Sequence, residues 1–183
     1  MKKFEPKTVK INNTEWMAEN LAIDDGKGGI FVAEDGNHYY TLEAAKRIAD
    51  SLGWRIPSYS EMYELAYVSG CKHGECWSSA IKSTSGWFTD ADGTSYNGTN
   101  KLGINIEPTG YVRKNKNGTF SVVRDGYEFC FYIGGEAHRQ AVRQSWIDEE
   151  KFVRCEIDGI GNEFEDKSFR IDDDYLLSVR LVK

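Results

Sequence analysis

Short apolar runs, broken again and again by glycine and asparagine, constrain this chain more than any other feature. Aromatic residues make up 13% of its 183 residues and are spread along the whole length. No apolar run approaches the ~20 residues that a membrane-spanning helix requires. Short runs with frequent turn residues are typical of strands joined by turns. The sequence therefore predicts many short strands and few helices.

Two helices are predicted, close together in the first half of the chain. In the segment 42–52, apolar residues fall at positions i, i+3, i+4 and i+7, which places them on one helical face. The segment 59–68 has a similar inward face formed by Met62, Leu65 and Ala66. Thr41 is the predicted N-cap of the first helix, and Gly53 is predicted to end it. Ser58 and Glu61 fit a capping box at the start of the second helix, and Gly70 is predicted to end that helix.

The strands are predicted on both sides of this helical pair. An Asn117-Gly118 turn signal indicates a hairpin between 110–114 and 119–124. Because the helices lie together and the strands come in runs, the class is α+β with antiparallel sheets. We expect one domain over residues 1–183, with residues 1–6 as a flexible tail. The other predicted strands are 8–11, 127–133, 151–157 and 176–182.

The charge balance excludes some partners. The formal net charge is −6, whereas a nucleic-acid-binding domain needs a basic face. Met1-Lys2-Lys3 resembles the basic start of a signal peptide, but the apolar stretch that should follow is missing. We therefore expect no nucleic acid partner and no membrane insertion. If Met1 is the natural start, we also expect no export by the general secretory route.

Candidate metal and catalytic groups are sparse. Cys71, His73 and Cys76 lie within six residues, but zinc needs four ligands, and Cys130 and Cys155 lack a ligand-like spacing. These cysteines are expected to be free thiols, with a Cys71–Cys76 disulfide or a zinc site as alternatives. The carboxylates at 172–174 and at 24–25 are weak calcium candidates, and no G-x-S-x-G elbow occurs. We expect no metal, no cofactor and no enzymatic activity.

Several short segments, taken in order, form a recognisable set. WMAENL at 16–21 and SVRLVK at 178–183 are the most specific. The other segments are TVKI at 8–11, YYT at 39–41, EAA at 43–45, GWRIPS at 53–58, KSTSGW at 82–87 and PTGY at 108–111. Together they resemble one known family, the Fibrobacter succinogenes major paralogous domain, over about residues 7–183.

This resemblance implies a C-type lectin-like fold with a long irregular loop region and paired N- and C-terminal strands. On that basis we expect Val9 and Ile11 to pair near Val179 and Leu181. The family has no catalytic residue to carry over. Calcium-dependent sugar binding is not expected, because Glu107-Pro108-Thr109 lacks the final carboxamide or carboxylate of the lectin motif and no Trp-Asn-Asp follows.

The aromatic residues fall into two predicted groups. Trp16, Trp54 and Trp87 lie in the family-like segments and are expected in the core, Trp54 as a wedge between the two helices. The candidate partner-binding residues are Tyr96, Tyr132 and Trp146. Tyr96 lies within 88–102, a segment rich in Gly, Asn, Thr, Ser and Asp, a composition suited to adaptable contacts around an aromatic anchor.

Three functions compete at this point. The first is a non-enzymatic structural or recognition domain on the surface of a phage particle, such as a head fibre, tail fibre or decoration protein. It would be made in the cytosol and bind a protein partner (itself, as a homo-oligomer, or another structural subunit) or a host surface protein or glycan. The second is a binding domain of a bacterial cell surface whose signal peptide is not part of this sequence. The third is an enzyme related to the formylglycine-generating branch of the same superfamily.

The sequence predicts that folding requires no metal ion. A bound ion at free concentration [L] would stabilise the folded state by RT ln(1 + [L]/Kd). Since no ion is expected, adding EDTA should leave the thermal unfolding midpoint unchanged. A fall of several degrees that calcium or zinc restores would contradict this prediction.

Overall fold

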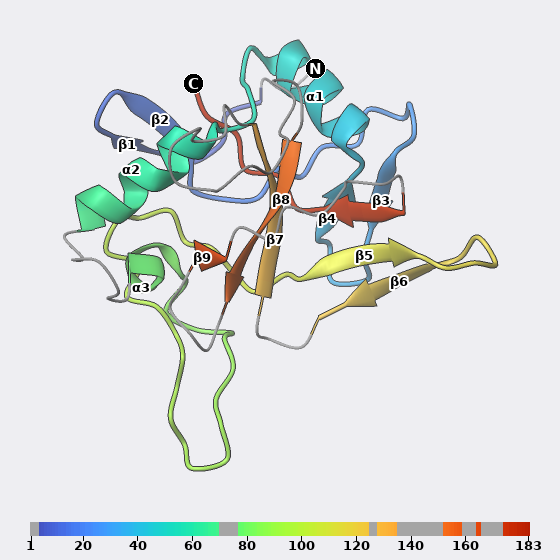
Figure 1. The fold of residues 1–183 in the computed structure, drawn as a ribbon. Coiled ribbons are helices and arrows are strands. Elements are labelled where there is room, and N and C mark those ends of the chain that lie inside the picture. The colour runs from blue at the N-terminus through green and yellow to red at the C-terminus, as the bar shows by residue number, and fades with distance from the viewer. Residues whose placement is uncertain (1–3, 70–76, 125–127, 135–151, 159–163, 166–173) are drawn as a thin grey trace, which may run out of the picture.

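Antiparallel sheets and three helices make up the part of the chain that the computed structural model describes, residues 4–69, 77–124, 128–134, 152–158, 164–165 and 174–183 (Figure 1). The α+β class is confirmed, and one of the sheets curls into a half-barrel. Among these residues no helix is both long and apolar enough to cross a bilayer.

The largest sheet gathers strands that are far apart in the sequence. Its order is β3-β4-β10-β5-β6, and every neighbouring pair is antiparallel. β10, near the C-terminus, lies at its centre, with Leu177 opposite Tyr40 on one side and Tyr111 on the other. The bounds are Ile30–Val32 for β3, His38–Tyr40 for β4, Tyr175–Leu177 for β10, Tyr111–Lys114 for β5 and Phe120–Val123 for β6.

Two smaller sheets complete the strand inventory of the described residues. β1 (Thr8–Ile11) and β2 (Thr14–Met17) form a hairpin whose turn residue Asn12 has a φ of 52°, a left-handed conformation that asparagine tolerates. The third sheet has the order β7-β8-β9, and Phe131 stands opposite Cys155 in its register. Its strands are Glu128–Gly134, Phe152–Asp158 and Phe164–Glu165, close to the predicted 127–133 and 151–157.

The predicted β5–β6 hairpin is confirmed. Val112 pairs with Val122, and Gly118 adopts a φ of 82° in the connecting loop. The amide of Gly118 donates to the Asn115 carbonyl at 2.9 Å, and Asn115 N donates to Thr119 O at 2.7 Å. A type I turn followed by a left-handed glycine is a common hairpin loop. The turn that Asn117-Gly118 predicted therefore joins the two strands.

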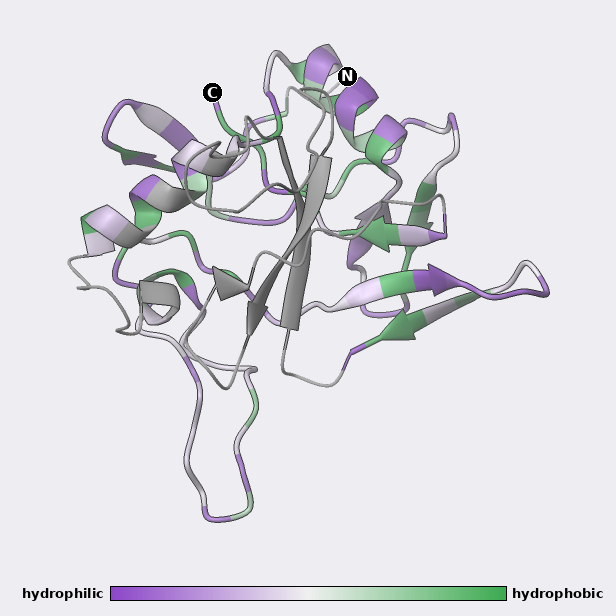
Figure 2. Cartoon of the chain, in the orientation of Figure 1, coloured by the Kyte–Doolittle hydropathy of each residue, from purple (hydrophilic) through white to green (hydrophobic). Residues whose placement is uncertain are grey.

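Both predicted helices form, with Thr41 and Gly53 as the caps of the first and Ser58 with Glu61 at the start of the second, whereas Gly70 lies outside the described residues. α1 spans Leu42–Leu52, and the Thr41 side chain accepts a hydrogen bond from Ala44 N. Figure 2 shows α1 banded with hydrophilic and hydrophobic residues, as expected for a helix with one buried face. α2 spans Tyr59–Ser69, so it covers the predicted 59–68 and one residue more. A third helix, α3 (Trp77–Ile81), was not predicted.

Glu61 joins α2 to two other elements. Its carboxylate accepts from Ser58 N at 2.8 Å, which completes the predicted capping box, and it forms a two-point ion pair with Arg55. Thr14 of β2 also donates to it at 3.2 Å. Burial would raise the pKa of Glu61, but the hydrogen bonds from Arg55 and Ser58 outweigh it and lower the pKa to about 2.

The C-terminal segment 178–183 closes the fold along β2. Met17 N donates to Leu181 O at 3.0 Å, and Leu21 N donates to Val179 O at 2.8 Å. The predicted meeting of the two chain ends is therefore confirmed, but the predicted partner was wrong. β2, not β1, pairs with the C-terminal segment, because β1 pairs with β2 and lies one strand further out.

This terminal segment separates two packed clusters and contributes to both. Val179 and Leu181 pack with the buried face of α1, in the α1 cluster. Val182 packs on the other side with Trp16, Trp87 and apolar residues of α2, in the α2 cluster. Alternation along an extended segment places successive side chains on opposite faces, which explains the division.

The three predicted core tryptophans differ in burial. Trp16 is 2% exposed and Trp87 is 4% exposed, so both are core residues as predicted. Trp54 is only partly buried against the α1 cluster, with Lys183 Nζ 6.0 Å from its ring centre. The prediction that Trp54 is a buried core residue that holds the two helices together was wrong, because it lies partly exposed at the edge of one cluster.

The burial difference predicts the outcome of two substitutions. Trp87→Ala should lower the free energy of unfolding by about 3–5 kcal/mol, the usual loss for a fully buried tryptophan. Trp54→Ala should cost clearly less, because part of its ring already contacts solvent. Urea unfolding of both variants tests this, with Tyr67→Ala, at a side chain that is 82% exposed, as the control. Equal losses for Trp54 and Trp87 would contradict the prediction.

Candidate functional site

The segment 88–96 forms a hairpin arm that projects from the body of the molecule (Figure 1). Thr89 bridges Ser95, and Tyr96 N donates to Phe88 O at 3.0 Å. At the tip, Asp90 N donates to Thr94 O and Gly93 N donates to Asp90 O, both at 3.0 Å. The arm therefore has a defined hairpin backbone.

The base of the arm is fixed to the core. Trp87 is buried, and its indole Nε1 donates to Ser83 Oγ at 3.0 Å and to Ile106 O at 3.2 Å. Its amide donates to the Asn97 side chain at 3.0 Å. On the other side, Gly98 approaches Lys82 so closely that a Cβ there would lie 2.3 Å from the Lys82 carbonyl oxygen. The arm thus stands on a rigid base, although its own residues are largely exposed.

Tyr96 occupies the root of the arm. Its ring stacks on Phe88 with centroids 6.0 Å apart, and its hydroxyl donates to Asp90 Oδ2 at 3.2 Å. The hydrogen bond with Asp90 raises the pKa of Tyr96, because it stabilises the protonated phenol. Tyr96 is partly exposed, so it supports the arm from within and also offers one edge to a partner.

The other two predicted partner-binding residues are not brought together with Tyr96 in the described structure. Tyr132 lies on β7 opposite Arg154, in a sheet described by its backbone alone. Trp146 lies outside the described residues. The cysteine and histidine group at 71–76 also lies outside them, as do Asp172 and Asp173.

The remaining candidate metal residues have structural roles. Asp24 accepts from Gly26 N at 2.8 Å within a turn, and Asp25 forms an ion pair with Arg47 of α1. Among the described residues, no three His, Cys, Asp or Glu side chains are grouped as metal ligands.

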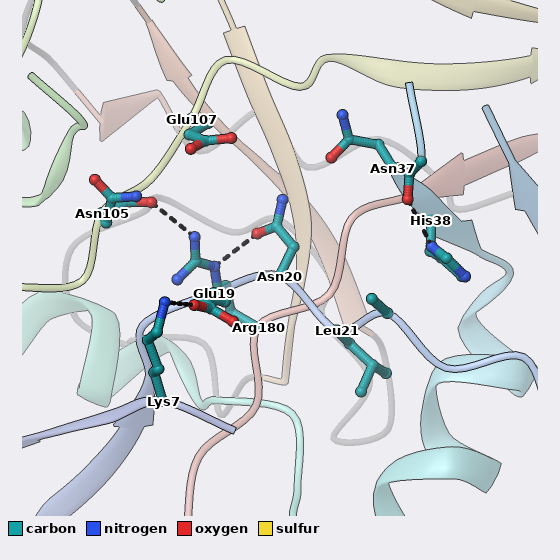
Figure 3. Close-up of a pocket in the computed structure, with 11 residues that line it drawn as sticks. Lys7, Glu19, Asn20, Leu21, Asn37, His38, Asn105, Glu107 and Arg180 are labelled. Carbon is teal, nitrogen blue, oxygen red and sulfur yellow. Dashed lines mark hydrogen bonds and ion pairs between the residues drawn. The ribbon is translucent and has the colours of Figure 1, made fainter. Parts of the chain in front are cut away.

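Sequence reasoning missed a polar pocket of about 370 Å³ whose wall includes Arg180 (Figure 3). The pocket is lined by residues 19–22, which follow β2, by residues 36–38 at the start of β4, by Asn105 and Glu107, and by Lys7. Figure 3 shows these residues converging from separate elements around one space. Arg180 belongs to the terminal segment that closes the fold.

Arg180 is a buried cation held by neutral oxygens. It is 3% exposed. Nε donates to Asn20 Oδ1 at 2.6 Å and Nη2 donates to Asn105 O at 2.8 Å. Nη1 donates to the carbonyl oxygens of Met17 at 3.1 Å and Ile104 at 2.6 Å. Burial lowers the pKa of Arg180 to about 9, while the carboxylates of Glu107 and Glu19 favour its charged form.

One signal in the sequence could have revealed this residue. The segment 176–182 reads Leu-Leu-Ser-Val-Arg-Leu-Val, so an arginine interrupts an apolar run that is predicted to be buried. A charge in such a place must be paired or hydrogen-bonded, which marks it for attention. Its partners were not predictable, because they lie 75 to 163 residues away.

No family model matches this chain, and neither a curated protein nor a solved structure shows a significant match to it. The arm and the pocket are therefore interpreted from their own geometry.

The hydrogen bonds of Arg180 predict a large structural effect. Arg180→Met should lower the free energy of unfolding by about 3–5 kcal/mol, because it leaves several buried oxygens without a donor. The matched control is Arg113→Met, at an exposed arginine of β5, which should change stability by less than about 1 kcal/mol. Urea denaturation measures both, and similar losses for the two variants would contradict the role assigned to Arg180.

Proposed function

We propose that this chain is a non-enzymatic recognition domain that binds a protein partner through the 88–96 arm. The observation that carries the proposal is the arm itself, a projecting hairpin whose base is fixed by the buried Trp87 while its tip is solvent-exposed. Loops on rigid scaffolds are the usual place for binding, because the scaffold limits the ordering that binding requires.

The composition of the arm supports protein contact. Asp90, Asp92 and Thr94 supply polar groups near the tip, and Phe88 with Tyr96 forms an aromatic pair at the root. Tyrosine contributes a large contact area for little conformational entropy, and small polar residues supply adaptable hydrogen bonds. The Asp92 carboxylate accepts a hydrogen bond from Thr94 N at 2.9 Å, and as an ionised aspartate it gives the tip a negative charge at neutral pH.

The resemblance to the Fibrobacter succinogenes major paralogous domain extends the proposal. It favours a C-type lectin-like fold and display on a phage particle, as part of a head or tail fibre or as a decoration protein. The partner would then be a second copy of the chain, another structural subunit, or a surface of the host. Display on a bacterial cell surface is the alternative that the same resemblance supports.

Substitutions at the arm tip test the proposal. Ala91→Lys and Thr94→Lys place new charges on exposed positions of the arm, and we expect them to weaken self-association at least about tenfold, measured by analytical ultracentrifugation. Lys116→Glu, at the exposed tip of the β5–β6 hairpin, is the matched control and should associate like the unchanged chain.

The structure of the assembly gives the second measurement. A specific interface should bury at least ~1,000 Å² and include the arm. A chain that stays monomeric at its highest soluble concentration, together with an assembled particle in which the arm touches no neighbouring subunit, would contradict the proposal.

A further inference from the structure

The pocket beside Arg180 holds two opposite charges that do not neutralise each other directly. Lys7 and Glu19 form an ion pair at the rim, which leaves Arg180 and Glu107 as the remaining formal charges of the lining. Among the described residues, no ion pair joins Arg180 to Glu107, and the Glu107 carboxylate has no hydrogen-bond donor. Glu107 is exposed, so this carboxylate is available to a ligand.

The buried guanidinium of Arg180 also has one N–H donor without a partner among the described residues. An arginine carries five N–H donors, and four of those of Arg180 are engaged by Asn20, Met17, Ile104 and Asn105. The remaining N–H, on Nη2, has no partner in the described part of the chain. An unpaired donor on a side chain that is only 3% exposed is unusual, because such groups are normally satisfied. A ligand carboxylate at this point would satisfy it.

Further polar groups around the pocket lack partners among the described residues. Asn20 uses its side-chain oxygen to hold Arg180, so its NH₂ group is left for a ligand. Asn105 has a φ of 56°, a left-handed conformation that asparagine tolerates. Its backbone carbonyl oxygen accepts from Arg180, and its side-chain carboxamide has no hydrogen bond among the described residues. His38 donates from Nδ1 to Gly36 O, which leaves Nε2.

We propose that this pocket binds a small zwitterion, a free α-amino acid or a close analogue, with the ligand carboxylate on Arg180 and Asn20 and its ammonium group on Glu107. The volume of about 370 Å³ is within the range of small-ligand sites. A simple anion is disfavoured because it would face the Glu107 carboxylate, and a simple cation is disfavoured because it would face Arg180. The site does not depend on the arm, so this inference does not rest on the proposed function.

The direct test is titration of the full chain with each of the twenty standard amino acids, followed by isothermal calorimetry or by ¹⁵N NMR. At least one amino acid should bind, with shifts at the amides of Asn20 and Asn105. For that amino acid, the N-acetyl derivative lacks the ammonium group and the primary amide lacks the carboxylate. Both derivatives should bind at least about tenfold more weakly.

A pair of variants assigns the ammonium contact. Glu107→Gln keeps the shape of an exposed side chain, so it should fold normally, and it should weaken binding about tenfold or more. Glu34→Gln removes one exposed carboxylate outside the pocket and should leave the affinity unchanged.

Three outcomes overturn the inference. The first is that none of the twenty amino acids binds, including the case in which a neutral sugar such as glucose binds instead. The second is that the N-acetyl derivative binds as tightly as its parent, which would indicate a site for simple anions. The third is that Glu107→Gln binds the amino acid as well as or better than the unchanged chain.

Discussion

The guanidinium of Arg180 is the interaction on which the rest of the structure depends. It reaches from the C-terminal segment to Met17 at the end of β2 and Asn20 just after it, and to Ile104 and Asn105 in the middle of the chain. Those two regions are remote in sequence, and the several N–H donors of one guanidinium join their inward-facing oxygens at a single point. Replacing it with an apolar residue would remove the donor from all four oxygens at once. The buried charge is thus tolerated because the backbone around it is arranged to solvate it.

The same terminal segment explains why the packed clusters form one body. β10 is the central strand of the large sheet, and the residues that follow it pair with β2. Val179 and Leu181 fill the α1 cluster, Val182 fills the α2 cluster, and Leu176 packs with Tyr39 and Val112 in a third. The last residues of the chain must therefore be in place before any cluster is complete. Such long-range contacts slow folding relative to local ones, because loop closure precedes the gain from packing.

Local features were predictable from the sequence, and distant pairings were not. Thr41, Gly53, Ser58 and Glu61 define helix ends through contacts within a few residues, so the bounds of α1 and α2 could be predicted closely. The β5–β6 hairpin was predictable for the same reason.

The choice of β2 rather than β1 as partner of the C-terminal segment depends on which edge of a hairpin is covered, and both strands carry suitable apolar residues. The partial exposure of Trp54 likewise depends on how it packs against the α1 cluster, and the residues next to it in the sequence do not predict that packing. For the candidate site, the sequence indicated Tyr96 and the 88–102 loop, but the pocket is built from segments that meet only in the folded chain.

The arm and the pocket share one short stretch of backbone. Ile106 O accepts from the Trp87 indole at the base of the arm, and Ile106 N donates to Ile81 O. One and two residues earlier, the carbonyl oxygens of Asn105 and Ile104 accept from Arg180 in the pocket wall. The segment 104–106 therefore cannot move to suit a ligand without disturbing the hydrogen bonds that fix the arm. A buried arginine with several donors is suited to hold such a segment still, because any shift would break more than one bond. Rigidity in the segment 104–106 lowers the conformational entropy that binding would cost at the arm and at the pocket. One short segment can therefore support both the arm and the pocket.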